Sequence, residues 1–184
     1  YLLKEKIPFT LFVSGKFALR NAEELRKLSH IDTVEIENHS MHHILHMERL
    51  PDDAVRVEVR DTARIIEEIT GRTPRYFRFP GGNCDERTVK EIEGLHYRVT
   101  HWSFASGDPD RRVTPGRLTG WVLKKTHPGS ILIFHINGRG YATGRALPGI
   151  MKELKKRGYT FIRLEDALDP VHAALHMGTS GTGK

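Results

Sequence analysis

Short apolar runs alternate with longer amphipathic segments along most of the chain. The runs are rich in β-branched and aromatic residues, which is typical of strands, and cover residues 9–13, 33–36, 76–78, 97–102, 131–135 and 159–164. The segments between them have apolar residues near helical spacing, at residues 22–28, 52–69, 85–92, 114–124 and 145–156. We expect Asn21 to cap the first helix. This alternation predicts an α/β fold with a parallel sheet, whose functional residues gather at the carboxyl ends of the strands.

The composition is that of a globular chain. Of its 184 residues, 38% are hydrophobic and 28% are charged, and no linker or low-complexity segment divides them. We expect one domain over residues 1–176 and a flexible tail over residues 177–184. The single cysteine, Cys84, excludes an intramolecular disulfide and a zinc site made of cysteines alone. No apolar stretch approaches the roughly 18 residues that cross a bilayer, so no transmembrane segment is predicted.

The net charge of +6 raises the question of a nucleic-acid partner. Its basic residues are spread along the chain and alternate with acids, as in residues 56–68, which is typical of solvated helix faces. We therefore expect no nucleic-acid partner. The histidines are a stronger signal, because four of the 11 lie within residues 39–46.

This histidine cluster follows the second predicted strand. His39 and His43 are four residues apart, so on one helical turn both imidazoles would project from the same face and hold one cation. His42 and His46 have the same spacing, and the sequence does not choose between the two pairs. A histidine-rich turn can also be plain polar surface, but two matched pairs at a strand end favour a metal site. Ser40 stands where a metalloprotease motif would have its general-base glutamate.

A Pro-Gly-Gly turn follows the third predicted strand. Gly81 and Gly82 carry no side chain that would block the approach of a substrate to backbone N–H groups, and such donors can hold a developing oxyanion. Arg78, at the end of the strand, can clamp a carboxylate. Taken alone, Pro80-Gly81-Gly82 is more often an ordinary turn.

A further pair of candidates lies at the ends of two later strands. His135 ends a hydrophobic run, which is where parallel α/β folds keep catalytic groups. Asp108 follows the preceding strand and can orient and charge such a histidine. Each has an ordinary alternative, because His135 can be satisfied by backbone groups and Asp108-Pro109 is a common turn former.

The order of these motifs resembles that of the polysaccharide deacetylases, carbohydrate esterase family four. The matching residues are His39-Ser40-x-x-His43, Arg78-x-Pro80-Gly81-Gly82, Asp108 and Ile133-x-His135. Residues 7–15 resemble the family's second strand and residues 147–161 its closing helix and strand, so the resemblance covers almost the whole chain. Each motif alone is loose, but the ordered set is specific. The resemblance implies a distorted, incomplete (β/α) barrel.

The resemblance also implies a metal-dependent N-deacetylase. A divalent metal, most often Zn²⁺ in this family and otherwise Co²⁺ or Ni²⁺, would be held by His39 and His43. An aspartate acts as the base that activates water, and His135 would protonate the leaving amine. Asp108 would keep His135 cationic.

Contacts to the substrate follow from the same resemblance. The backbone N–H of Gly81, beside Gly82, would hold the tetrahedral oxyanion. Ile133 would wall the pocket for the acetyl methyl group, and Arg78 would tether the catalytic aspartate.

The sequence departs from the family pattern in two places. The family's first motif, an aspartate pair that supplies the base and the third metal ligand, has no counterpart here. We expect it upstream of Tyr1, on a strand that would make this chain start one βα unit late. The second departure is Pro109, which stands where the family usually has tryptophan. Trp102 is the candidate to replace that aromatic wall, although a core position is the simpler interpretation.

The implied substrate is an acetylated polysaccharide that contains N-acetylglucosamine: peptidoglycan, chitin or an exopolysaccharide. Such a polymer lies outside the membrane, so the resemblance implies an exported protein of the cell envelope or the extracellular space. Two alternatives stay open. They are a catalytically impaired carbohydrate-binding relative, favoured by the missing aspartate pair, and an O-acetyl xylan esterase. The sequence specifies neither the polysaccharide nor the oligomeric state.

Overall fold

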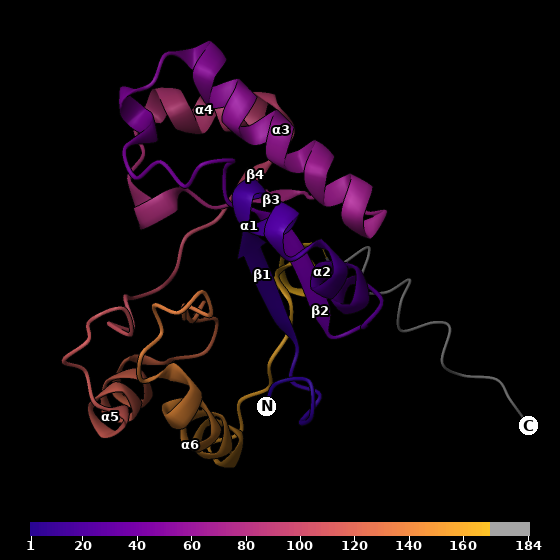
Figure 1. Cartoon of the computed structure of the whole chain (residues 1–184). Helices are drawn as coiled ribbons and strands as arrows, with labels where there is room; N and C mark the ends of the chain where they lie inside the picture. The colour runs from indigo at the N-terminus through magenta and orange to yellow at the C-terminus, as the bar shows by residue number, and fades with distance from the viewer. Residues whose placement is uncertain (170–184) are drawn as a thin grey trace, which may run out of the picture. The chain divides into compact units, whose positions relative to one another are not determined.

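The computed structural model describes residues 1–169 (Figure 1). The predicted tail over residues 177–184 lies outside the described residues, and the single domain over residues 1–176 stays a prediction. The chain divides into two compact units. The sheet unit contains Leu2–Thr100 and the residues from Phe161 onward, and the helical unit contains Tyr1 and His101–Thr160.

The sheet unit is built on a four-stranded parallel sheet with the order β1-β2-β3-β4. The strands are β1 (Phe9–Val13), β2 (Val34–Asn38), β3 (Tyr76–Phe77) and β4 (Arg98–Val99). β1 and β2 pair along their whole length, from Phe9 opposite Val34 to Val13 opposite Asn38. Each strand follows its neighbour through a helical crossover, as parallel pairing requires. The strand predicted over residues 97–102 is present as β4, but it is shorter than expected.

Local signals mark one end of two helices in the sheet unit. The helices of this unit are α1 (Gly15–Arg20), α2 (Ala22–Ser29), α3 (Asp52–Thr70), α4 (Glu86–Gly94) and α7 (Leu164–Leu168), with short 3₁₀ turns η1 (Met47–Arg49) and η2 (Pro80–Gly82). Asp85 caps α4 by accepting the backbone N–H of Thr88 at 2.8 Å. Gly71 ends α3 with φ 69°, a left-handed conformation that glycine adopts without strain. Asn21 stands at the N-cap of α2 as predicted, but its side chain donates to the Phe17 carbonyl at 2.8 Å and makes no hydrogen bond to the helix start.

α3 joins the two apolar clusters of the sheet unit. Its first half buries Val55 and Val59 against Phe77 and other residues of one cluster. Its second half contributes to a cluster made of Val13, Ala18, Leu25, Ile65, Ile66 and Ile69. The apolar stripe that predicted this helix is thus the surface that fixes it against β1, β3 and α2.

The helical unit contains α5 (Pro115–Lys125) and α6 (Thr143–Lys156), which pack against each other. Their facing residues Leu118, Val122, Ala146, Ile150 and Leu154 are buried. Both helices were expected from their spacing. Within the described residues, no helix has the length and apolar character to cross a membrane.

The predicted strand over residues 131–135 is not formed. One parallel bridge, between Phe104 and Leu132, is its only trace among the described residues. Side chains take the N–H groups that a neighbouring strand would use: Ser103 accepts from Ile131 at 2.9 Å, and Asp108 accepts from His135 at 2.7 Å. Side-chain hydrogen bonds to Ile131 and His135 therefore replace the backbone pairing that a strand here would make.

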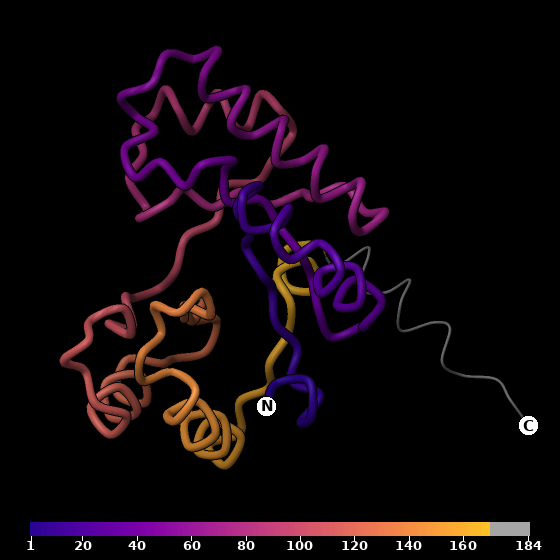
Figure 2. The backbone as a smooth tube through the Cα atoms, in the orientation of Figure 1, coloured from indigo at the N-terminus to yellow at the C-terminus, as the bar shows by residue number. Residues whose placement is uncertain are grey.

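The predicted strand over residues 159–164 is also wrong. Residues 159–163 form no strand, and Leu164 begins α7. The N–H of Leu164 donates to the carboxylate of Glu35 at 2.9 Å and to the hydroxyl of Thr10 at 3.0 Å. These contacts bring the C-terminal segment back to β1 and β2, as the yellow trace in Figure 2 shows. A run read as a strand from its composition thus ends in a short helix held by side chains of the sheet.

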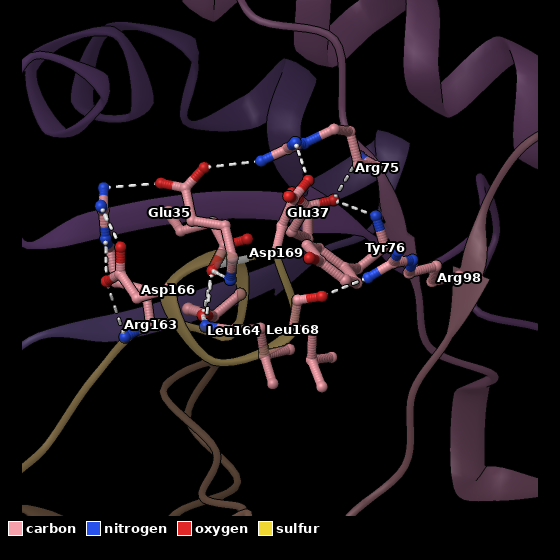
Figure 3. A network of polar contacts seen from close by, with 12 residues as sticks. Glu35, Glu37, Arg75, Tyr76, Arg98, Arg163, Leu164, Asp166, Leu168 and Asp169 are labelled. Atoms are coloured by element: carbon pink, nitrogen blue, oxygen red, sulfur yellow. Dashed lines mark hydrogen bonds and ion pairs between the residues drawn. The ribbon is translucent and has the colours of Figure 1, made fainter. Parts of the chain in front are cut away.

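Two glutamates of β2 lie beside this helix in a polar network (Figure 3). Glu35 and Glu37 are 5% and 4% exposed. Glu37 accepts the backbone N–H groups of Arg75 at 2.8 Å and Tyr76 at 2.7 Å. Burial raises the pKa of Glu35 and raises that of Glu37 to about 9. At neutral pH this pair of acids therefore holds a proton.

Arg75 ties the same region to α7. Its guanidinium donates to Glu165 at 2.9 Å and to Asp169 at 3.0 Å (Figure 3). Arg163, at the start of the helix, donates to Asp166 at 2.8 Å. The sheet and its C-terminal helix are thus joined by ion pairs beside a buried pair of acids.

Candidate active site

The histidine cluster lies in a loop of the sheet unit, directly after β2. Ser40 has φ 64° and His43 has φ 58°, so the predicted helical turn is wrong. The loop nevertheless brings His39 and His43 together. Their rings meet edge to face, with centroids 4.9 Å apart.

Buried polar groups fix the unusual backbone of this loop. Asn38, at the end of β2, donates to the carbonyl of Val59 in α3 at 2.9 Å. Its side-chain oxygen accepts the N–H of Ser40 at 3.0 Å, and the Ser40 hydroxyl accepts the N–H of His43 at 3.1 Å. Asn38 and Ser40 are fully buried, so these bonds are shielded from water. They impose the conformation that places the His43 ring beside His39.

The start of α1 supports the same loop from the other side. Gly15 donates its N–H to the Ser40 carbonyl at 3.0 Å, and Lys16 donates to the Met41 carbonyl at 3.1 Å. A Cβ on Gly15 would lie 2.1 Å from the sulfur of Met41. A helix that was not predicted from the sequence therefore packs so closely that a side chain at residue 15 would displace the Met41 side chain.

In the alternative pair, His42 and His46 each contact a different carboxylate. His42 contacts Glu58 of α3 twice, through its ring Nδ1 at 2.5 Å and its backbone N–H at 2.9 Å. His46 contacts Glu48 through Nδ1 at 2.9 Å. Of the two pairs that the spacing left open, the loop brings together His39 and His43.

The contact of His39 with Arg78 indicates which ring nitrogen carries hydrogen. Its Nδ1 lies 2.7 Å from the backbone oxygen of Arg78. Because a carbonyl only accepts hydrogen bonds, Nδ1 is the donor, and in the neutral ring Nε2 carries the lone pair. Metal-binding histidines are commonly oriented in this way by a backbone carbonyl.

These histidines fit a metal ion as part of its ligand set. Two imidazoles at this separation can direct nitrogens to one ion, and the orientation of His39 suits a ligand. Within residues 1–169, no group of three or more histidine, cysteine, aspartate or glutamate side chains suited to a metal is found. A catalytic zinc site usually has one more protein ligand than this pair supplies.

Arg78 lies buried beside the pair, with 7% of its surface exposed. Its Nε donates to the Thr100 carbonyl at 3.3 Å, and its guanidinium carbon lies 4.0 Å from the centroid of the Phe12 ring. Burial lowers the pKa of Arg78 to about 10, so the side chain still carries its charge at neutral pH. A cation is thus held next to the candidate metal ligands, while its predicted contact with a catalytic aspartate stays a prediction.

The Pro-Gly-Gly sequence forms the turn η2. Gly81 and Gly82 have φ values of 66° and 78°, a region that favours glycine. Gly82 donates its N–H to the Phe79 carbonyl at 3.0 Å and so closes the turn. The predicted binding of an oxyanion by Gly81 and Gly82 stays a prediction.

The helical unit contains the second group of candidates, in which a buried carboxylate holds a histidine. Asp108 is fully buried, whereas 34% of the His135 side chain is exposed. One carboxylate oxygen lies 2.8 Å from the ring Nδ1 of His135, and the other accepts its backbone N–H at 2.7 Å. The ring therefore has a fixed orientation with Nδ1 directed at the carboxylate.

Two hydroxyls complete the surroundings of Asp108. Ser106 donates to one carboxylate oxygen at 3.0 Å, and Thr143 donates to the other at 2.7 Å. Burial alone would raise the pKa of Asp108, but the hydrogen bonds from His135 and Thr143 outweigh it and lower the pKa. Asp108 is therefore a carboxylate at neutral pH.

Sequence reasoning missed two residues of this group, Thr143 and Gly140. A Cβ on Gly140 would lie 2.1 Å from the His135 carbonyl oxygen and 2.6 Å from the Thr143 hydroxyl. The signal that was available is the sequence Gly138-Arg139-Gly140 just after His135, since closely spaced glycines mark close backbone approaches.

The remaining candidates of the helical unit are Trp102 and Ile133, and both are half-buried. The Trp102 ring packs edge to face against His101, with centroids 5.5 Å apart. Ile133 lies in the segment that does not form a strand. Their predicted contacts with a sugar and an acetyl group stay predictions.

A comparison with known families decides what these two groups of residues belong to. Residues 1–100 match the family model described as polysaccharide deacetylase. The chain belongs to the polysaccharide deacetylase family. The predicted family is thus confirmed.

Similar proteins agree with this assignment. The chain is 30% identical over 176 residues to the peptidoglycan-N-acetylmuramic acid deacetylase PdaA of Bacillus subtilis, covering 91% of this chain and 63% of PdaA. It is 29% identical to a peptidoglycan-N-acetylglucosamine deacetylase of Bacillus cereus, with 93% and 80% covered. The chain thus spans less than two thirds of the length of PdaA.

A solved structure extends the likeness to the fold. A family 4 carbohydrate esterase pseudoenzyme from Bacillus anthracis matches this chain with TM-score 0.81 and 28% identity. The match covers 91% of this chain and 58% of that one. The predicted α/β class with parallel strands, of the family's distorted barrel type, is confirmed. The neighbours of this fold therefore include deacetylases and a pseudoenzyme.

Proposed function

We propose that the chain is the catalytic part of a metal-dependent hydrolase that removes N-acetyl groups from an N-acetylglucosamine-containing polysaccharide. The observation that carries the proposal is the contact of Asp108 with His135, in which one buried carboxylate receives both the ring Nδ1 and the backbone N–H. Such a histidine is prepared to give a proton to a leaving amine.

The metal would be held by His39 and His43, whose rings already lie edge to face beside each other. When bound, a divalent ion such as Zn²⁺ supplies a Lewis acid that polarises the acetamide carbonyl. The reaction also needs a further metal ligand besides His39 and His43, and a base that activates the water. Arg78 would orient this site through its carbonyl contact with His39.

Proton transfer would be the task of the other group of residues. Because Nδ1 of His135 faces Asp108, the proton given to the leaving nitrogen would come from Nε2. The carboxylate stabilises the charged ring and stays ionised itself, since hydrogen bonds lower its pKa. Gly81 would hold the oxyanion, and Ile133 would contact the acetyl methyl group.

The substrate class is inferred from the relatives. Two of them are named for the deacetylation of peptidoglycan sugars, N-acetylmuramic acid in one and N-acetylglucosamine in the other. We infer peptidoglycan as the first substrate to test, with chitin and an exopolysaccharide after it. A protein that acts on these polymers would be exported to the cell envelope or beyond.

Acetate release tests the proposal. The protein is incubated with peptidoglycan, N-acetylglucosamine oligomers and acetylated xylan, and free acetate is measured. We expect release from at least one of the N-acetylated substrates and loss of that release in His135→Ala. Release from xylan alone would overturn the N-deacetylase and favour an O-acetyl esterase.

A second function is supported by the pseudoenzyme relative and by the two-histidine ligand set. In this alternative the protein binds an acetylated polysaccharide without hydrolysing it. Binding of the same oligomers, measured by calorimetry, without any acetate release would favour this function over catalysis.

A further inference from the structure

The first residue of α6 contacts the buried carboxylate of the helical unit. The Thr143 hydroxyl donates to Oδ2 of Asp108 at 2.7 Å, and the threonine itself is 6% exposed. The same Oδ2 accepts the backbone N–H of His135. The other oxygen, Oδ1, contacts the His135 ring and accepts the Ser106 hydroxyl.

We propose that Thr143 is a positioning residue, which holds the Asp108 carboxylate in the rotation that directs one oxygen at the ring of His135. The inference rests on the proposed role of His135 as the proton donor. It adds to that role a residue that no motif of the sequence identified.

Each carboxylate oxygen of Asp108 accepts hydrogen bonds from two donors. A carboxylate can turn about its bond to Cβ, and donors on both oxygens oppose this rotation. Without the Thr143 hydroxyl, Oδ2 would keep one donor while Oδ1 keeps two. In a fully buried site the lost bond is not replaced freely by water. The carboxylate would then hold the ring less firmly.

The backbone around Thr143 places the hydroxyl. Its N–H donates to the Gly140 carbonyl at 3.2 Å, and a side chain on Gly140 would collide with the Thr143 hydroxyl. The turn before α6 is therefore closed tightly enough to fix where the helix begins. Thr143 reaches Asp108 because this turn brings the helix start to it.

The charges near Asp108 are few. Of the side chains that contact it in the described part of the chain, His135 is an ionisable residue, whereas Ser106 and Thr143 are neutral. A change at Thr143 therefore alters the hydrogen bonding of Asp108 without altering the formal charge around it. The hydrogen bond from Thr143 is one of the contacts that lower the pKa of Asp108.

The test compares Thr143→Val, which removes the hydroxyl and keeps the branched shape, with Thr143→Ser, which keeps the hydroxyl. Thr126→Val is the matched control, because Thr126 ends α5 of the same unit and donates to a backbone carbonyl, that of Val122, at 2.7 Å. Carbon-13 spectra follow the titration of the Asp108 carboxyl, and nitrogen-15 spectra follow the tautomer of the His135 ring.

We expect Asp108 to titrate at higher pH in Thr143→Val, with a smaller share of the Nδ1–H tautomer at His135, and no change in Thr143→Ser or Thr126→Val. If Thr143→Val fails to fold, Thr143→Ala provides the same comparison. An Asp108 titration and a His135 tautomer unchanged in folded Thr143→Val, or in Thr143→Ala, would overturn the proposal.

The spectra need no turnover, so they separate this inference from the proposed function. If the enzyme is active, Thr143→Val should lower kcat about tenfold, the order expected for the loss of one hydrogen bond to a charged group. Thr143→Ser should restore kcat. Spectral changes in a protein that releases no acetate would support the role of Thr143 and contradict the deacetylase.

Discussion

His39 and His43 show how the same spacing can serve two different conformations. A separation of four residues suggested one helical turn, but positive φ values at Ser40 and His43 produce a loop with the rings together. The loop depends on Asn38, whose partner Val59 is 21 residues away. Local periodicity cannot reveal such a contact, so the sequence predicted which residues matter without predicting their backbone.

Zinc binding should distinguish the two histidine pairs. His39→Ala and His43→Ala should each weaken binding by more than the roughly 10–100-fold that outer-shell changes cost, because each would remove a ligand. His46→Ala should bind like the wild type, since His46 contacts Glu48 instead. Competition with a chromogenic chelator measures the affinities. Loss of zinc in His46→Ala, with retention in His39→Ala, would show that the other pair holds the metal.

Gly140 should be intolerant of a side chain. Gly140→Ala would place a methyl group 2.1 Å from the His135 carbonyl oxygen, so the segment must move. We expect a loss of about 1–3 kcal/mol in the free energy of unfolding, as for other overpacked sites. Urea denaturation measures it.

Gly144→Ala is the control for this substitution. Gly144 lies in α6, and a Cβ there meets nothing within 4 Å. Alanine also favours a helix over glycine, so this variant should be at least as stable as the wild type. Equal stability of the two variants would contradict the close approach at Gly140.

At the scale of elements, helices were easier to predict than strands. The stripes of α3 and α6 are local signals, and the helices lie close to their predicted ranges. Residues 131–135 have the composition of a strand, but their N–H groups at Ile131 and His135 donate to side chains. Residues 159–164 have a similar composition, but the last of them begins α7. α1 was missed because six residues carry too little periodicity. Strand pairing depends on distant partners, which composition does not specify.

The acids of β2 should make the stability of the sheet unit depend on pH. The raised pKa of Glu37 means that the folded chain keeps a proton that the unfolded chain releases near pH 4.5. This stabilisation is complete below about pH 4.5 and is lost as the pH rises toward about 9. Glu37→Gln keeps an oxygen for the N–H groups of Arg75 and Tyr76 and does not titrate.

We therefore expect the free energy of unfolding to fall less between about pH 5 and about pH 9 in Glu37→Gln than in the wild type. Urea denaturation across this range measures the difference. Glu93→Gln, at an exposed site on α4, is the control and should follow the wild type. A Glu37→Gln curve parallel to the wild-type curve would show that Glu37 is ionised in the folded chain.

At the scale of the whole molecule, the order of motifs was more informative than any single motif. His39, Arg78, Asp108 and His135 each have an ordinary structural explanation, yet their sequence order resembled one family, and the comparison with known families confirms it. The structure distributes them over two compact units, with histidines and arginine in one and the Asp108–His135 pair in the other. We propose that both groups take part in one metal-dependent reaction.

Acetate release from peptidoglycan is the direct test of this metal-dependent reaction. It is measured after treatment with a chelator and again after addition of Zn²⁺. The assay should use the chain itself and the longest natural chain that contains it. We predict release that stops with the chelator, returns with zinc, and is lost both in His39→Ala and in His135→Ala. Release that continues without metal, or survives either substitution, would contradict it.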